Sequence, residues 1–177
     1  PAVWSRSNMP FYQHWALWLL AHTVPWGVVS GRSLDITPSD NEEMLEKLGK
    51  DPLVIKESRI DTVYGLTNLM DAAYDAAAYF NAKALFLYGK KDEIIPSAPI
   101  GKVFKKRFNG QFSQPQRFIV YENGYHMLLR DLQAEVVWKD IFSWLSNSSG
   151  KFPSVQAGSA IEIISEKEIK TFYPELI

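Results

Sequence analysis

The 177 residues of this chain contain no cysteine and have no marked excess of charge of either sign. Without cysteine, neither a disulfide framework nor a thiolate metal site can form, and residence in the cytosol is permitted. The 19 basic and 20 acidic residues give a net charge of -1, which offers no electrostatic attraction to nucleic acid. The composition therefore argues against disulfide-stapled proteins and against nucleic-acid partners.

A long apolar run is also missing from the sequence. The longest stretch, around residues 15–21, is far shorter than the roughly 18 to 20 residues that span a bilayer, and no basic region precedes it as in a signal peptide. The histidines His14, His22 and His126 are too scattered for a metal-ligand signature. We expect no transmembrane segment, metal or cofactor, and a cytoplasmic or peripherally membrane-associated protein. We interpret the start at Pro1, without an initiator methionine, as internal.

The chain is 46% hydrophobic and long enough for one core, and its first part, residues 1–82, reads as helical. Apolar residues recur at helical spacing across residues 9–22, with further apolar side chains around the cylinder. Two interpretations stay open for this helix: packing in a core, or a cap helix that faces an oily ligand.

Two further helices are predicted in this part. Ser39 stands where a helix cap is expected, Glu42 completes a capping box, and Gly49 is placed to end the helix. An apolar pattern of helical period then predicts a long helix over residues 60–80.

The pattern changes near residue 83. Short, unbroken apolar runs at 84–88 and 117–121 predict strands buried on both faces, and helices are predicted at 98–108 and 135–145. This alternation is the βαβ rhythm of a parallel α/β sheet. Two strands cannot form such a sheet, so we expect the remaining strands to come from residues outside this chain. Residues 83–146 are thus predicted as part of an α/β core and 147–177 as a tail, in which 160–164 forms a short strand or a docked segment.

Two polar loops each follow the carboxyl end of a predicted strand, the edge at which open α/β sheets place their ligands. The first contains Asp92 and the second His126. Adjacent parallel strands would bring these residues side by side. A carboxylate beside an imidazole fixes its tautomer, so that the ring can accept a proton from a nucleophile. A histidine in a loop is more often structural, but its position relative to Asp92 favours catalysis.

Residues 87–96 (LYGKKDEIIP) resemble the acid loop of the monoacylglycerol lipase and lysophospholipase branch of the α/β-hydrolases, and residues 121–128 (YENGYHML) resemble its histidine loop. The resemblance extends through 39–41 and 51–53 to residues 1–2, which are similar to the strand that precedes the cap, and it covers about residues 1–146. It implies an α/β fold that represents the C-terminal portion of an α/β-hydrolase with an N-terminal helical cap. In that family the triad runs Ser, Asp, His along the chain, and Asp92 and His126 match the last two.

The sequence departs from the family in one respect, because it contains no Gly-x-Ser-x-Gly. Ser30 and Ser33 lie near Gly31 but without the required spacing. We therefore expect the nucleophile and the oxyanion loop in an N-terminal part of the same hydrolase, outside these 177 residues, and expect the chain alone to be inactive.

The resemblance implies a serine hydrolase for lipid-like carboxylic esters such as monoacylglycerol or lysophospholipid. Five cap residues are candidates for the acyl-chain pocket: Trp4, Phe11, Trp15, Trp18 and Trp26. Aromatic residues in a helical layer are also common in cores. Two alternatives remain, a hydrolase of the same fold that cleaves peptides or small esters, and a non-catalytic module that binds a ligand or partner.

Overall fold

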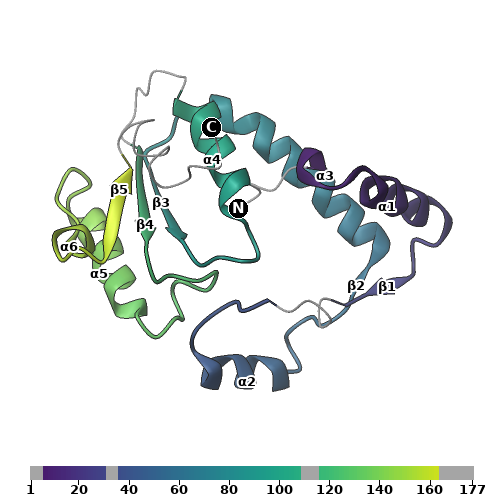
Figure 1. Cartoon of the computed structure of the whole chain (residues 1–177), viewed down its shortest axis with the longest axis horizontal. Helices are drawn as coiled ribbons and strands as arrows, with labels where there is room; N and C mark the ends of the chain where they lie inside the picture. The colour runs from purple at the N-terminus through teal and green to yellow at the C-terminus, as the bar shows by residue number, and fades with distance from the viewer. Residues whose placement is uncertain (1–5, 31–35, 109–115, 164–177) are drawn as a thin grey trace.

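The computed structural model describes residues 6–30, 36–108 and 116–163. Figure 1 shows a small sheet with helices on both sides, and a separate helical region reached by long connections. The sheet region is built from β3 (Ala84–Gly89), α4 (Ser97–Phe108), β4 (Gln116–Tyr121), α5 (Ala134–Ser146), α6 (Pro153–Gln156) and β5 (Ala160–Ile163). The helical region contains η1 (Arg6–Asn8), α1 (Phe11–Thr23), β1 (Val28–Val29), α2 (Glu42–Lys50), β2 (Ser58–Arg59), α3 (Ile60–Ala76) and η3 (Ala77–Tyr79).

The predicted parallel pair is confirmed. β3 and β4 run parallel from the pair Ala84–Gln116 to the pair Gly89–Tyr121, so both strands end at the same level. The short strand predicted near residue 160 is β5, which pairs with β4 in the antiparallel direction and gives the order β3-β4-β5. Among the described residues, β3 pairs with β4 alone.

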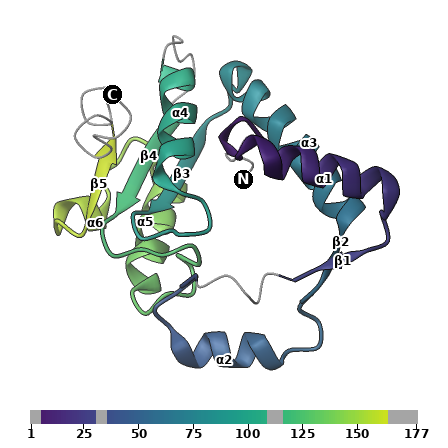
Figure 2. The ribbon, with the colours of Figure 1, turned by 45° about the vertical axis from the view of Figure 1, so that its right-hand side comes forward.

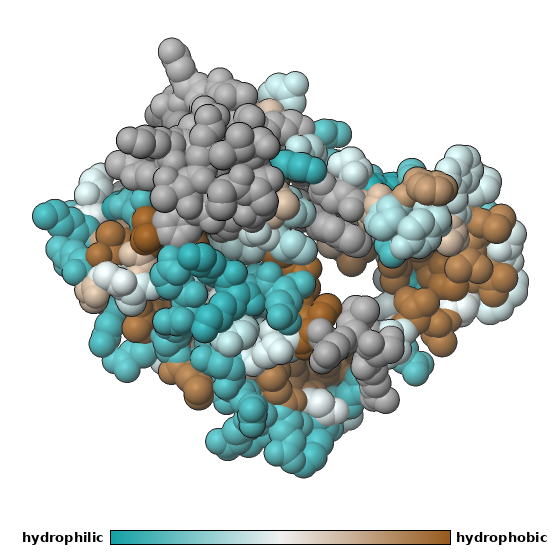
Figure 3. All heavy atoms as spheres, in the orientation of Figure 1, coloured by the Kyte–Doolittle hydropathy of each residue, from teal (hydrophilic) through white to brown (hydrophobic). Residues whose placement is uncertain are grey.

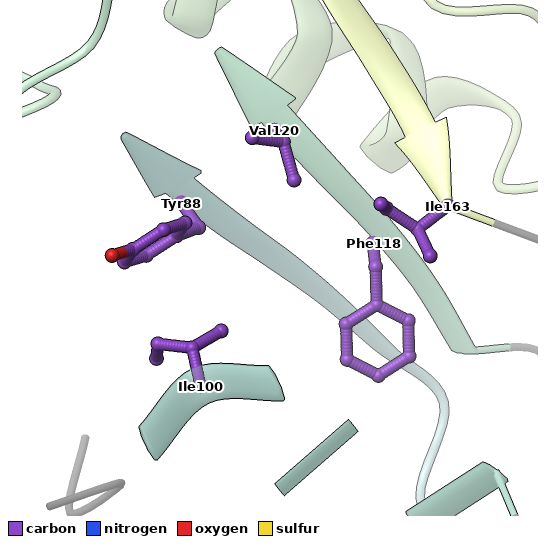
Figure 4. Close-up of a cluster of buried hydrophobic side chains, with 5 residues drawn as sticks. All are labelled: Tyr88, Ile100, Phe118, Val120 and Ile163. Atoms are coloured by element: carbon purple, nitrogen blue, oxygen red, sulfur yellow. The ribbon is translucent and has the colours of Figure 1, made fainter. Parts of the chain in front are cut away.

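Side chains of β4 alternate between the two faces of the sheet, as the pleat of a strand requires. Phe118 and Val120 point to the face covered by α4, where they form a cluster with Tyr88, Ile100 and Ile163 (Figure 4). Ile119 and Tyr121 point to the opposite face, which α5 and α6 cover. The sheet is therefore buried on both faces, as its unbroken apolar strands predict.

Polar contacts fasten the last elements to β4. The Arg117 guanidinium donates to both carboxylate oxygens of Glu162 on β5, at 2.5 and 2.7 Å. On the α5 side, buried Asp140 accepts hydrogen bonds from the Tyr121 hydroxyl and from the backbone of Ser154. Burial and the bond to Asp140 raise the pKa of Tyr121 above its ordinary value, so its hydroxyl keeps the proton that it donates.

Within the helical region, η1, α1, β2 and η3 contact α3, whereas α2 lies apart from these elements (Figure 1). Figure 2 shows α1 alongside α3, and β1 pairs with β2 next to this helix pair. His22 of α1 stacks on Trp18 and meets Tyr64 of α3 edge to face, so this histidine belongs to the packing between the two helices. The helix predicted over 60–80 is α3 up to Ala76 and continues as the 3-10 turn η3.

The predicted start and end of the second helix are wrong. α2 begins at Glu42, and its cap is Asn41, whose side chain accepts a hydrogen bond from the Met44 amide. The Ser39 hydroxyl instead donates to Asp131, far along the chain. Gly49 lies within the helix, which ends at Lys50. The capping rule therefore assigned the wrong role to Ser39, because its hydroxyl is hydrogen-bonded to a residue distant in the sequence.

Most apolar side chains of α1 are exposed. The helix has no buried residue, and its exposed aromatic residues are accompanied by exposed Leu19 and Leu20. In Figure 3 hydrophobic residues gather at the right of the molecule, over the α1 region. Within the described parts of the chain, no helix has the length and apolar character needed to cross a membrane.

Candidate active site

The site is built on the carboxyl ends of β3 and β4. Because Gly89 and Tyr121 are register partners, the loops that follow the two strands leave the sheet at the same edge. Two backbone bonds join these loops: the Lys90 amide donates to Tyr121 O at 3.0 Å, and the Lys91 amide donates to Gly124 O at 2.9 Å. The two loops therefore form one bonded unit.

The loops approach so closely that Gly89 has no room for a side chain. A Cβ atom there would lie 2.4 to 2.5 Å from backbone atoms of Gly124 and Tyr125. Contacts of that length with backbone cannot be relieved by rotation of a side chain. Gly89 thus allows the histidine loop to lie directly against the end of β3.

An ion pair at the base of the loops was not anticipated from the sequence. Lys90 Nζ lies 2.8 Å from Glu122 Oε2. Each residue directly follows a strand, Lys90 after β3 and Glu122 after β4. Opposite charges at equivalent positions after two parallel strands were the signal that could have revealed it.

Asp92 is held in one orientation by its own loop. Its Oδ1 accepts hydrogen bonds from the Ile94 and Ile95 amides, each at 2.9 Å. Its Oδ2 lies 2.9 Å from His126 Nδ1, and 6% of the Asp92 side chain is exposed. The structure therefore brings together the acid and the histidine that the sequence singles out.

The geometry of this pair defines what it can do. An ionised carboxylate only accepts hydrogen bonds, so the bond to Asp92 assigns the proton to His126 Nδ1 and leaves the Nε2 lone pair as a base. About one third of the His126 side chain, 34%, is exposed, which gives a reacting group access to the ring. Such a pair can take a proton from a nucleophile and stabilise the imidazolium that results.

A cavity of about 700 Å³ lies beside the pair. Its lining includes Asp92 and His126 and all of β3 except its first residue, from Leu85 to Gly89, so it follows the edge of β3 that faces away from β4. Apolar side chains from α3, α4 and β4 complete it: Ala73, Ile100, Val103 and Phe118. The cavity therefore extends from the edge of β3, with which no described strand pairs, to Asp92 and His126.

The aromatic residues predicted to bind substrate lie elsewhere. Phe11, Trp15 and Trp18 are on α1, and Trp26 is in the turn before β1. All four are exposed, and none belongs to the described lining of this cavity. Trp4 lies outside the described residues. Their role in binding stays a prediction. No three Asp, Glu or His side chains of the described segments are grouped as metal ligands.

Comparison with known proteins supplies an independent view. The model of the family described as serine aminopeptidase, S33, matches residues 1–133. The crystal structure of Paleococcus ferrophilus monoacylglycerol lipase is similar to this chain, with a TM-score of 0.67, 20% sequence identity and 82% of the chain covered. The chain spans 55% of the length of that lipase. No curated protein matches the chain.

These similarities confirm the predicted fold class. A parallel pair with helices on both faces and a helical segment before it is what part of an α/β-hydrolase contains, and the lipase shares this arrangement over most of the chain. All of α5 and the α6–β5 segment lie beyond the residues that the family model matches.

Proposed function

The chain belongs to the family described as serine aminopeptidase, S33, within the α/β-hydrolases, and from this premise we propose that it forms the acid and base part of a serine hydrolase for lipid-like carboxylic esters. The observation that carries the proposal is the bond between His126 Nδ1 and Asp92 Oδ2, formed by two loops that follow neighbouring parallel strands. In the proposed reaction a serine attacks the ester carbonyl while His126 takes its proton. His126 then protonates the departing alcohol, which leaves the acyl group on the serine. Water, deprotonated by the same ring, attacks this acyl-serine ester and releases the acid and the serine, and Asp92 orients the ring throughout.

The proposal places the nucleophile on a segment outside the 177 residues. No Gly-x-Ser-x-Gly occurs among them, and the match that covers 82% of this chain covers only 55% of the structurally similar lipase. The edge of β3 is the proposed docking surface for that segment. It is a six-residue strand of mostly apolar sequence, with an apolar cavity along the edge away from β4. A further parallel strand on this edge would end beside His126, where a serine has to lie.

Two observations support an ester substrate with an apolar chain. The similar structure is that of a monoacylglycerol lipase, and α1 carries no Asp, Glu, Lys or Arg while exposing aromatic side chains. Apolar surface of this kind favours methylene groups by about 0.8 kcal/mol for each one buried. The same exposed helix supports a protein that lies in the cytoplasm or attaches peripherally to a lipid surface.

A peptidase is the second candidate, because the matching family is described as a serine aminopeptidase. An aminopeptidase requires a carboxylate that can receive the α-ammonium group of its substrate. In the two loops beside the site, the carboxylates are already engaged: Asp92 with His126, Glu93 with the Thr37 amide, and Glu122 with Lys90. The ester stays the first candidate because of the likeness to the lipase structure and the apolar residues of α1.

The proposed base is tested by substituting histidines in the hydrolase assembled from this chain and its nucleophile segment. We expect His126→Ala to lower kcat for a chromogenic medium-chain ester by at least about 10³-fold, since the triad acts as a unit. His14→Ala is the matched control, because His14 is exposed on α1, and it should retain most of the activity. Equal activity in the two variants would show that His126 is not the base. Hydrolysis of an aminoacyl anilide in preference to the ester would favour the peptidase.

A further inference from the structure

A short connecting segment, residues 37–41, contacts both loops of the site. It leads from the β1 side of the helical region into α2, and we name it the strap. We propose that the strap, through Ser39 and Asp131, is a positioning device that fixes the backbone of His126 for catalysis. This inference rests on the proposed function, and neither Ser39 nor Asp131 contacts the reacting atoms.

The strap and Asp131 together hold the backbone on both sides of His126. The Tyr125 amide donates to Asp131 Oδ2 at 2.8 Å, and the Met127 amide donates to Pro38 O at 3.1 Å. These are the residues directly before and after the histidine. The bond to Asp92 orients the imidazole ring, whereas these two bonds fix the position of the His126 backbone.

Asp131 can act in this way because its carboxylate is buried and fully engaged. It is 3% exposed, and the Ser39 hydroxyl, in a residue 1% exposed, donates to its Oδ1 at 2.6 Å. Removing one partner would leave a buried polar group unsatisfied. The position of the Tyr125 amide therefore depends on the Ser39 hydroxyl through a single buried carboxylate.

Further bonds tie the strap to the acid loop and to the segment after the histidine. The Thr37 amide donates to Glu93 Oε2 at 2.7 Å, next to Asp92 in the chain. The Leu132 amide donates to Asp40 Oδ1 at 2.8 Å, and Asn41 Nδ2 donates to Arg130 O at 2.9 Å. The strap is thus bonded to the neighbours of both Asp92 and His126, so its displacement would change the relative position of the pair.

The molecule contains a matched control for this device. Ser154 is also 1% exposed, and its hydroxyl also donates to a buried carboxylate, that of Asp140. This second pair links α6 to α5 on the far face of the sheet and makes no described bond to either loop. A serine-to-alanine change at either position removes one hydroxyl from one buried aspartate. Only the aspartate that Ser39 bonds also accepts a hydrogen bond from a residue next to His126, whereas Asp140 bonds the Tyr121 side chain on β4.

The test compares Ser39→Ala with Ser154→Ala in the assembled hydrolase. We expect Ser39→Ala to lower kcat about tenfold with KM within about twofold, because a small misplacement of a catalytic group reduces the rate and not ground-state binding. Ser154→Ala should leave kcat within about twofold of the parent. Asp131→Ala should lower kcat at least as much as Ser39→Ala, and Asp131→Asn, which keeps an acceptor for the Tyr125 amide, should recover part of the loss.

A second readout does not depend on activity. In the assembled hydrolase, Ser39→Ala should shift the NMR signals of the His126 ring, and Ser154→Ala should leave them in place. An equal loss of kcat in both serine variants, or unshifted His126 signals in Ser39→Ala, would overturn the positioning role. If the assembled parent protein hydrolyses no ester, the proposed function fails, and the NMR comparison still decides whether the strap positions His126.

Discussion

At the scale of single residues, the approach of the two loops depends on the missing side chain of Gly89. A Cβ at this position would meet the backbone of Gly124 and Tyr125, which cannot rotate away. The loops would have to separate, and the bonds from Lys90 and Lys91 to the histidine loop would lengthen. The contact between Asp92 and His126 therefore depends on a residue that carries no functional group.

We expect Gly89→Ala to lower the free energy of unfolding by about 1–3 kcal/mol, the usual cost of overpacking. Ester hydrolysis by the assembled enzyme should fall as well. Gly65→Ala is the control, because Gly65 is exposed in the middle of α3 and a Cβ there meets nothing within 4 Å. It should raise stability by about 0.5–1 kcal/mol through better helix propensity. Urea unfolding of both variants checks this, and unchanged stability in Gly89→Ala would contradict the close approach.

Sequence reasoning identified Asp92 and His126 because strand ends are readable from apolar runs and the loops that follow them. Asp131 and Ser39 could not be found in this way. Their link joins residues 92 positions apart, and local rules assign the hydroxyl of Ser39 to a helix cap. Pairings of this kind depend on which segments the fold brings together.

At the scale of elements, the described residues 152–163 after α5 pack against the sheet and extend it. Phe152, just before α6, is fully buried in the cluster with Ile119, Tyr121 and Val137, and β5 extends the sheet beyond β4. This segment lies outside the residues that the family model matches. The sequence indicated a strand near residue 160. The residues before it are rich in Ser, Gly and Pro, which are typical of turns, and they did not indicate that Phe152 is buried.

We predict that Phe152→Ala lowers the free energy of unfolding by about 3–5 kcal/mol, as expected for loss of a buried aromatic ring. Phe142→Ala provides the comparison, since Phe142 is exposed on the outer face of α5, and it should change stability by less than about 0.5 kcal/mol. Denaturant midpoints of the two variants provide the measurement. Similar midpoints would mean that the segment is not integral to the fold.

Helices were easier to predict than their ends. The cores of α1, α3, α4 and α5 follow from apolar periodicity, which extends over several turns. Ends depend on one or two hydrogen bonds, so α2 begins after Asn41 and α3 gives way to η3 before residue 80. The antiparallel direction of β5 likewise depends on its pairing with β4, which its own four residues do not specify.

At the scale of the whole molecule, the proposed function accounts for two features together: an edge of β3 with which no described strand pairs, and the absence of Gly-x-Ser-x-Gly. Both are expected if these residues form one part of an α/β-hydrolase and another polypeptide segment supplies the neighbouring strand and the serine. The exposed apolar side chains of α1 fit the same proposal, since they are available to a further surface or to an apolar substrate. Asp92 and His126 are therefore proposed to act on a serine that lies outside these 177 residues.

The most direct test is covalent labelling of the native protein that contains this chain. A fluorophosphonate probe reacts with a serine that is activated by a neighbouring base, and peptide mass spectrometry identifies the labelled residue. We predict a label on the serine of a Gly-x-Ser-x-Gly peptide outside residues 1–177, and loss of that label in His126→Ala. Labelling of a serine within the 177 residues, or equal labelling with and without His126, would contradict the account.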